Sequence, residues 1–258
     1  MARTAARTWQ RCSGGRLALA AAAVLLSGCG GSGSASPPLT RSSSSSSSAA
    51  PTTSTTVHYT ASVVAQAKIP SVAVFDTSTG TTPSKTLANP QPSGSPLVFL
   101  VKGSEGSRLS VLLPIRPNGS TGWIERSDVT LSQHDYRIVV ALGAHMITVY
   151  KGDAVFDQEP IGVGTKDTPT PGGTYYTKEL YKLPTATGPY GPFAYALSGY
   201  SDVLTDFAGG DGVLGIHGTN DPSAVGHDVS HGCIRMSNAG ITKLAQTLPL
   251  GVPVQIEA

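Results

Sequence analysis

Cysteine is scarce in this chain, and its scarcity limits how the fold is stabilised. The 258 residues contain Cys12, Cys29 and Cys233, so only one thiol lies beyond residue 29. A single cysteine forms no internal disulfide, and we expect a hydrophobic core to supply the stability instead. An unpaired cysteine in an exported protein also indicates a reactive thiol.

A strong charge of either sign is missing as well. Four of the 18 basic residues are Arg3, Arg7, Arg11 and Arg16, which leaves 14 basic against 16 acidic residues after position 28, a net charge of −2. No basic patch remains to indicate nucleic acid, and no acidic run indicates a cationic partner. We therefore expect no nucleic-acid partner.

The N-terminal apolar run, Leu17–Leu26, follows those arginines and is too short for a stable membrane span. A basic segment followed by a short apolar run is typical of a secretory signal. The sequence Leu26-Ser27-Gly28-Cys29 resembles the bacterial lipobox, which implies a signal peptide over 1–28 and a lipid on Cys29. The protein would then be lipid-anchored to the cell membrane and face the cell wall or periplasmic space. The alternative is an ordinary signal peptide with Cys29 incidental.

Residues 29–56 have almost no apolar side chains to bury. The segment is mostly Ser, Gly, Thr, Ala and Pro, with an unbroken serine run from Ser42 to Ser48. This composition predicts a disordered linker. It would give a lipid-anchored protein reach into the wall, or act as a spacer without a tuned length.

Two β-rich regions follow, over 57–132 and 133–258. In the first, short apolar segments are separated by prolines and by the turn signal Asn118-Gly119. These segments are 71–75, 97–101, 109–113 and 122–124. They predict a small β-barrel or sandwich, and residues 113–124 resemble the closing strands of a bacterial SH3-like domain. A generic small β domain that only positions its neighbour is the alternative.

In the second region, alternating segments predict a meander of hairpins. They cover 136–142, 146–150, 155–158, 161–163 and 174–177. Residues 187–193 are too rich in Pro and Gly for a core strand, so we expect a loop. Residues 213–216 read as a buried strand ending at His217. Ser237 is a candidate cap for a helix, which Pro249 and Gly251 end, and residues 252–256 form a last strand.

Near Cys233 the sequence contains the residue types that activate a thiol nucleophile. A cysteine attacks as thiolate, and an imidazole within hydrogen-bond reach removes its proton. His217 is positioned to approach from a neighbouring strand. The amides of Gly232 and Cys233 are candidate donors to an oxyanion.

Three competing roles for Cys233 are open on these residues alone. It can be a buried structural residue with satisfied histidines nearby. It can belong to a metal site with His217, His227 and His231, although the spacing matches no common zinc signature. A papain-like hydrolase places its nucleophile before its histidine, whereas here His217 precedes Cys233.

Two motifs nevertheless resemble a known family. His217-Gly218-Thr219-Asn220 and the stretch from Ser230 to Met236 (SHGCIRM) are similar to the signature of the YkuD-type L,D-transpeptidase catalytic domain. The likeness extends back through 168–172 and covers about 133–257. It implies a mainly β fold: a β-sandwich-like catalytic domain with one or two short helices, preceded by the small β-barrel or SH3-like domain.

The resemblance also implies roles for individual residues. Cys233 would be the acyl-forming nucleophile and His217 its base, oriented by the backbone carbonyl of Gly218. His231 and Gly232 would line the oxyanion and acyl pocket, and Ser230 would hold the loop.

The remaining roles carry alternatives. Arg235 would bind a substrate carboxylate or only brace the loop. Tyr190, Phe193 and Tyr195 would form a lid over the peptide stem or pack beneath a loop. We expect His227 to face solvent.

The implied reaction crosslinks peptidoglycan stem peptides without a cofactor or metal. Cys233 would attack the carbonyl of the diamino acid at position three of a donor tetrapeptide, and an acceptor stem amine would resolve the acyl-enzyme. The family's reactivity implies acylation by carbapenems at this cysteine. We expect a monomer. An L,D-carboxypeptidase, an enzyme that attaches protein to peptidoglycan, and a non-catalytic wall-binding lipoprotein are the alternatives.

Overall fold

The structure, a computed structural model, describes residues 60–206 and 210–258. The predicted signal peptide, the lipidation site Cys29 and the predicted linker lie outside these residues. Within the described ranges, no helix has the length and apolar character needed to cross a membrane. The described residues belong to one compact unit, and the mainly β fold expected from the sequence is confirmed.

The first region builds a five-stranded antiparallel sheet in the order β6-β5-β4-β1-β7. Three strands follow predicted apolar segments, whereas β1 and β7 carry weaker patterns and are recognised only by their pairing over six residues. The SH3-like assignment stays a prediction. The strands are β1 (Ser62–Ala67), β4 (Val98–Glu105), β5 (Arg108–Leu112), β6 (Thr121–Glu125) and β7 (Val129–His134), beside a hairpin of β2 (Ser71–Val74) and β3 (Lys85–Ala88).

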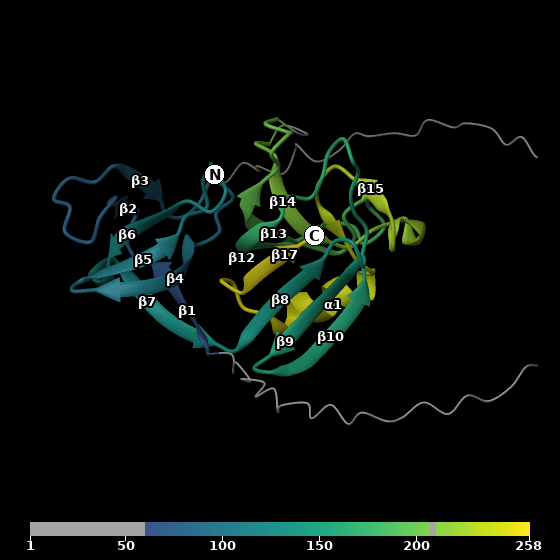
Figure 1. Cartoon of the computed structure of the whole chain (residues 1–258), viewed down its shortest axis with the longest axis horizontal. Coiled ribbons are helices and arrows are strands. Elements are labelled where there is room, and N and C mark those ends of the chain that lie inside the picture. Colours follow the sequence, from purple (N-terminus) through teal and green to yellow (C-terminus); the bar gives the residue numbers. More distant parts are fainter. Residues whose placement is uncertain (1–59, 207–209) are drawn as a thin grey trace, which may run out of the picture. The chain divides into compact units, whose positions relative to one another are not determined.

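The second region builds an eight-stranded sheet in the order β10-β9-β8-β17-β12-β13-β14-β16 (Figure 1). Two neighbouring pairs, β17 with β8 and β14 with β16, are parallel, and the others are antiparallel. A short parallel pair, β11 with β15, lies outside this sheet. The bounds are β8 (Tyr136–Ala141), β9 (Met146–Lys151), β10 (Ala154–Pro160), β11 (Val163–Gly164), β12 (Gly173–Lys182), β13 (Phe193–Tyr200), β14 (Val213–His217), β15 (Asp228–Ser230), β16 (Ile234–Arg235) and β17 (Pro253–Glu257).

Strand β13 was not expected from the sequence. The loop was predicted over 187–193, but its last residue, Phe193, already begins β13. The strand then passes through Ser198 and Gly199, which have low strand propensity. A Cβ on Gly199 would overlap the ring of Tyr175, so the missing side chain makes room for that aromatic ring. Packing from a neighbouring strand has therefore overridden local propensity.

A single α-helix, α1 (Asn238–Thr247), occurs in the described residues, together with the 3-10 turns η1 (Arg126–Asp128) and η2 (Pro222–Ala224). The predicted cap is confirmed, since the Ser237 hydroxyl accepts a hydrogen bond from the Gly240 amide at 2.9 Å. Ile241 and Leu244 are fully buried, and the helix packs against β13 and β14. Thus α1 supports the strand that ends at His217.

Tyr176 of β12 joins the two sheets. Its side chain is completely buried, and its hydroxyl donates to the Val98 carbonyl of β4 at 2.9 Å. Val64, Leu100 and Leu112 of the five-stranded sheet pack around it in one apolar cluster. The two β regions therefore share buried surface as well as a peptide connection.

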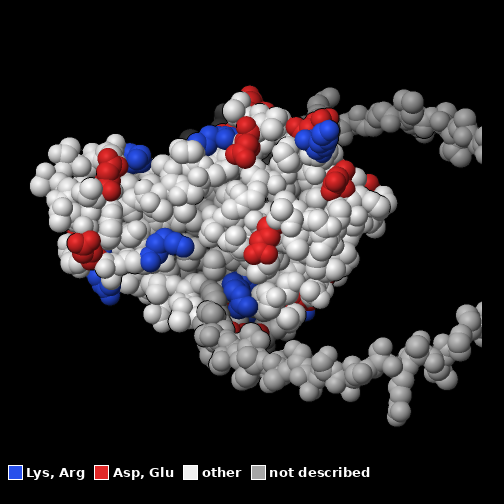
Figure 2. Space-filling view, in the orientation of Figure 1, with Lys and Arg blue, Asp and Glu red and all other residues white. Residues whose placement is uncertain are grey.

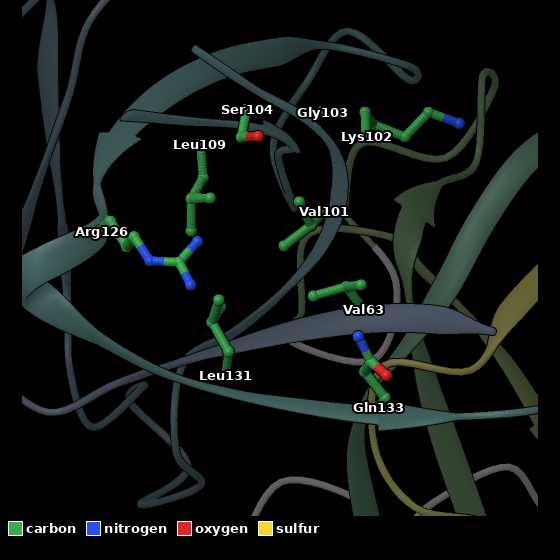
Figure 3. Close-up of a pocket in the computed structure, with 9 residues that line it drawn as sticks. All are labelled: Val63, Val101, Lys102, Gly103, Ser104, Leu109, Arg126, Leu131 and Gln133. Carbon is green, nitrogen blue, oxygen red and sulfur yellow. The ribbon is translucent and has the colours of Figure 1, made fainter. Parts of the chain in front are cut away.

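The surface has two further features. In Figure 2, Lys and Arg side chains are interspersed with Asp and Glu on the face in view, with neither sign gathered into a patch. A hollow of about 320 Å³ lies on the five-stranded sheet (Figure 3) and includes none of the predicted site residues. Its lining is Val63, Val101, Lys102, Gly103, Ser104, Leu109, Arg126, Leu131 and Gln133.

The cap of α1 gives a stability prediction. The Ser237 hydroxyl also donates to Glu159 at 2.8 Å, so Ser237→Ala removes two hydrogen bonds. We expect a loss of about 1 kcal/mol in the free energy of unfolding, measured by urea denaturation. Ser127→Ala, at an exposed serine, is the control and should change stability by less than about 0.5 kcal/mol. Equal effects of the two substitutions would contradict the role of the cap.

Candidate active site

The parallel pairing of β14 with β16 brings the two sequence motifs together. Ile216 is in register with Ile234, and His217 with Arg235. Side chains alternate between the faces of a strand, so Cys233, one residue before Ile234, lies beside Gly215 on the face that also carries His217. The sulfur of Cys233 is 3.7 Å from the position that a Cβ on Gly215 would occupy. A Cβ there would touch the thiol at an ordinary van der Waals distance.

His217 is held in one tautomer. It is 3% exposed, and its Nδ1 lies 2.5 Å from the carbonyl oxygen of Gly218. A carbonyl only accepts, so Nδ1 carries the hydrogen and Nε2 keeps its lone pair. The pKa of His217 is lowered to about 4, chiefly because of burial and also because of the charge of Arg235, while the hydrogen bond to the Gly218 carbonyl acts in the opposite direction. The imidazole is therefore neutral at pH 7 and able to accept a proton.

The thiol of Cys233 is also uncharged in this state. The residue is half-buried and forms no disulfide. Desolvation raises the pKa of the thiol above its usual value, while a backbone hydrogen bond from Gly215 and the charge of Arg235 act in the opposite direction. The resting pair is thus a neutral thiol and a neutral imidazole.

Hydroxyl groups hold the loop that precedes the thiol. The Ser230 hydroxyl donates to the Cys233 carbonyl at 2.6 Å and accepts from the Gly232 amide at 3.1 Å. The predicted loop-holding role of Ser230 fits these contacts. The Gly232 amide is occupied, contrary to the expectation that it binds an oxyanion, which leaves the Cys233 amide as the candidate donor. Gly232 has a φ of 112°, a conformation that favours glycine.

Two threonines that sequence reasoning did not single out support the same loop. Thr170 donates to the Gly232 carbonyl at 2.9 Å, and Thr168 donates to the Ser230 carbonyl at 3.1 Å. Thr170 is 5% exposed. Both lie in the Thr- and Pro-rich segment 168–172 before β12, whose composition does not indicate which loop it contacts.

Arg235 is half-buried at the edge of the sheet. Its backbone exchanges two hydrogen bonds of 2.8 Å with Gly162. Its Nε is buried and has no hydrogen-bond partner among the described residues. A buried guanidinium nitrogen without a partner is costly unless another group, such as a ligand carboxylate, supplies the acceptor.

The three aromatic residues of the predicted lid lie in different surroundings. Tyr190 lies against His217, with ring centroids 4.8 Å apart in an edge-to-face arrangement. Phe193 is half-buried at the start of β13 and packs on the main core. The lid role of Tyr195 is wrong, because its side chain is completely buried and its hydroxyl donates to the Leu244 and Leu248 carbonyls.

Asn238, at the start of α1, connects two loops near His217. Its Oδ1 accepts from the Thr219 amide at 2.9 Å, and its Nδ2 donates to the Ala186 carbonyl at 3.2 Å. A Cβ on Gly218 would overlap the same Oδ1. No local pattern in the sequence indicates this contact, since Asn238 is far from both loops along the chain.

The other histidines lie outside this arrangement. His227 is exposed, as expected, and His231 is exposed as well; its role in lining an acyl pocket stays a prediction. Across residues 60–206 and 210–258, no group of three or more His, Cys, Asp or Glu side chains is placed to hold a metal ion.

The depressed pKa of His217 makes stability depend on pH. Between about pH 6.5 and pH 4 the unfolded state binds a proton at this histidine that the folded state does not, so the folded state loses stability as pH falls. We expect His217 to account for about 3 kcal/mol of that loss by pH 4. Urea denaturation at several pH values should show a shallower dependence in His217→Gln. Parallel curves for the two proteins would refute this assignment.

Comparisons with known proteins add a family to this geometry. Residues 135–256 match the model of the YkuD L,D-transpeptidase catalytic domain. The chain is 36% identical over 121 residues to proteins that carry the name L,D-transpeptidase YkuD in Bacillus licheniformis and Bacillus subtilis. The match spans 47% of this chain and 65% of the length of each relative.

Solved structures include the catalytic domain of an L,D-transpeptidase from E. faecium. It is 26% identical to this chain, and the match covers 48% of this chain and 98% of that domain, with a TM-score of 0.35. The family match covers the strand that carries His217 and the residues around Cys233. Residues 135–256 of this chain are therefore similar to the catalytic domain of the YkuD-type L,D-transpeptidase family.

Proposed function

We propose that this protein is a peptidoglycan L,D-transpeptidase that works through an acyl-enzyme on Cys233. The observation that carries the proposal is the β14–β16 pairing, which supports a shared site for the thiol and His217. The substrates are a donor tetrapeptide stem and an acceptor stem. The product is a crosslink between their position-three diamino acids.

Acylation begins from the neutral pair. The sulfur attacks the carbonyl carbon of the position-three residue, while the thiol proton passes to Nε2 of His217. The Gly218 carbonyl stabilises the imidazolium through Nδ1. The peptide C–N bond then breaks, and the imidazolium gives its proton to the departing D-alanine amine. A thioester on Cys233 remains.

Deacylation repeats these steps with a new nucleophile. The side-chain amine of the acceptor stem attacks the thioester carbonyl, and its proton passes to His217. The C–S bond breaks, and the sulfur recovers the proton as the thiol. Neither half-reaction requires a redox cofactor or a metal ion, because the imidazole moves every proton.

The backbone around the nucleophile supports an oxyanion site. The Cys233 amide lies in a loop held by Ser230 and Thr170 hydrogen bonds, so a donor there needs little reorganisation during reaction. The unpartnered Nε of Arg235 suits a carboxylate of the donor stem. Tyr190, beside His217, limits access of water to the base.

The N-terminal sequence supports a location for this activity. We propose that residues 1–28 are a lipoprotein signal peptide, that Cys29 carries the lipid, and that 29–56 is the linker. The catalytic domain would then act on the wall side of the membrane, as a monomer.

Two other activities use the same acyl-enzyme. Water as the acceptor gives an L,D-carboxypeptidase, and a protein amine gives attachment of protein to peptidoglycan. A non-catalytic wall-binding role instead draws on the hollow of the five-stranded sheet, where Lys102 and Gln133 offer polar groups (Figure 3). The pairing of β14 with β16, which places Cys233 and His217 on one face, favours a catalytic role over a non-catalytic wall-binding role.

A carbapenem tests the acyl-enzyme directly. We expect intact-mass spectrometry to show one stable adduct on the wild-type protein, mapped to Cys233 by peptide digestion. Cys233→Ala should show none. Because His217 must be neutral to accept the proton, the acylation rate should stay level down to about pH 5 and fall near pH 4. The absence of an adduct on folded wild-type protein would count against the proposal.

Purified muropeptides test the acceptor. With tetrapeptide muropeptides, we expect chromatography to show crosslinked dimers and free D-alanine, both lost in Cys233→Ala. Tripeptide monomers without dimers would identify the carboxypeptidase. If the tetrapeptide stays unchanged while the protein still reacts with a carbapenem, both the crosslinking activity and the carboxypeptidase activity on isolated stem peptides are contradicted.

A further inference from the structure

The loop that joins β5 to β6, residues 113–120, contacts the hairpin formed by β13 and β14. We call it the bracing loop. The sequence predicts a tight turn at Asn118-Gly119, and Gly119 does have a φ of 80°. The connection is nevertheless longer than a tight hairpin, because β5 ends at Leu112 and β6 begins at Thr121. The additional residues reach the other sheet.

Arg116 of the bracing loop binds three backbone carbonyls. Its guanidinium donates to Ser201 at 2.8 Å, to Leu204 at 3.1 Å and to Asp211 at 2.8 Å. These carbonyls lie on both stems of the β13–β14 connection. Hydrogen bonds from a charged donor are stronger than neutral ones, and the planar guanidinium directs several at once. One side chain thus ties the two stems together.

Asn118 and Pro114 hold the end of β13. The Asn118 amide group donates to the Tyr200 carbonyl at 2.8 Å and accepts from the Tyr200 amide at 2.8 Å. It therefore pairs with Tyr200 as a neighbouring strand would. The Tyr200 hydroxyl donates to the Pro114 carbonyl at 2.7 Å, and the Arg116 guanidinium lies 4.9 Å from the centre of the Tyr200 ring.

The hairpin needs this support because its own ladder is interrupted. The register shifts between Ala196 and Tyr200, so three residues of β13, 197–199, lie opposite the single residue Leu214 of β14. The connection also closes tightly, since the Ser201 amide donates to the Gly212 carbonyl at 2.8 Å. Gly212 has a φ of 72°, and a Cβ there would overlap the Leu204 carbonyl oxygen.

We propose that the bracing loop is part of the acylation apparatus, with Arg116 and Asn118 as positioning residues. They hold the start of β14 at Val213, two residues before Gly215, whose backbone contacts the thiol of Cys233. The first sheet thereby sets the geometry of the nucleophile. This inference rests on the proposed acylation of Cys233.

The test compares Arg116→Ala, Arg116→Lys and Asn118→Ala with the wild type. The measurement is the second-order rate of carbapenem acylation, by intact mass, on protein shown to be folded by its melting curve. We expect Arg116→Ala to slow acylation about ten- to a hundred-fold, as small misplacements of reacting groups do. Lysine keeps the positive charge but not the planar guanidinium that directs several hydrogen bonds at once, so Arg116→Lys should recover part of the acylation rate.

A second readout separates positioning from stability. The pH dependence of iodoacetamide alkylation reports the pKa of the Cys233 thiol, which should shift in Arg116→Ala because the Gly215 hydrogen bond changes. Arg126→Ala is the matched control. Arg126 is an exposed arginine of η1, in the same β region, that lines the hollow, and its loss should leave the rate and the thiol pKa unchanged.

The outcomes are distinguishable. A wild-type protein that forms no adduct refutes the proposed function, whatever the variants do. A wild-type protein that reacts, with folded Arg116→Ala and Asn118→Ala reacting at the same rate, overturns the bracing role. Should Arg116→Ala fail to fold, Arg116→Lys and Asn118→Ala decide by the same criterion. An effect of Arg126→Ala as large as that of Arg116→Ala would also overturn it.

Discussion

The parallel pairing of β14 with β16 is the constraint on which the site depends. Parallel pairing fixes which side chains share a face, so a shift of one residue would turn Cys233 away from His217. The remaining structure keeps this register. Gly162 bonds the outer side of Arg235, α1 packs beneath β14, and the Met236 amide donates to the His217 carbonyl at 2.9 Å.

Burial shifts the pKa values of the thiol and the imidazole in opposite directions, yet both shifts favour the uncharged form. Desolvation disfavours the charged form of each, so it raises the pKa of Cys233 and lowers that of His217. The pair therefore rests uncharged, and under the proposed mechanism charge develops only when a carbonyl is attacked. The Arg235 charge favours the thiolate and disfavours the imidazolium, which suits proton transfer coupled to attack rather than a resting ion pair.

The two sheets divide the support of the site between them. The second β region supplies His217 and Cys233 and, through Thr170 and Ser230, the hydrogen bonds that hold the loop before the thiol. The five-stranded sheet contributes buried contacts to Tyr176 and the bracing contacts of Arg116. A region without a predicted chemical role thus contacts the end of β13 and the connection that leads into β14, the strand that carries His217.

The sequence alone determined the features that depend on neighbouring residues. It predicted the mainly β fold, the Ser237 cap, and the motifs around His217 and Cys233, because periodicity and capping are local. Tertiary structure decided the rest. Tyr195 belongs to the core, Asn238 joins two loops, and Arg116 reaches the other sheet, because pairings between distant residues follow from how the strands align. Local composition does not encode that alignment.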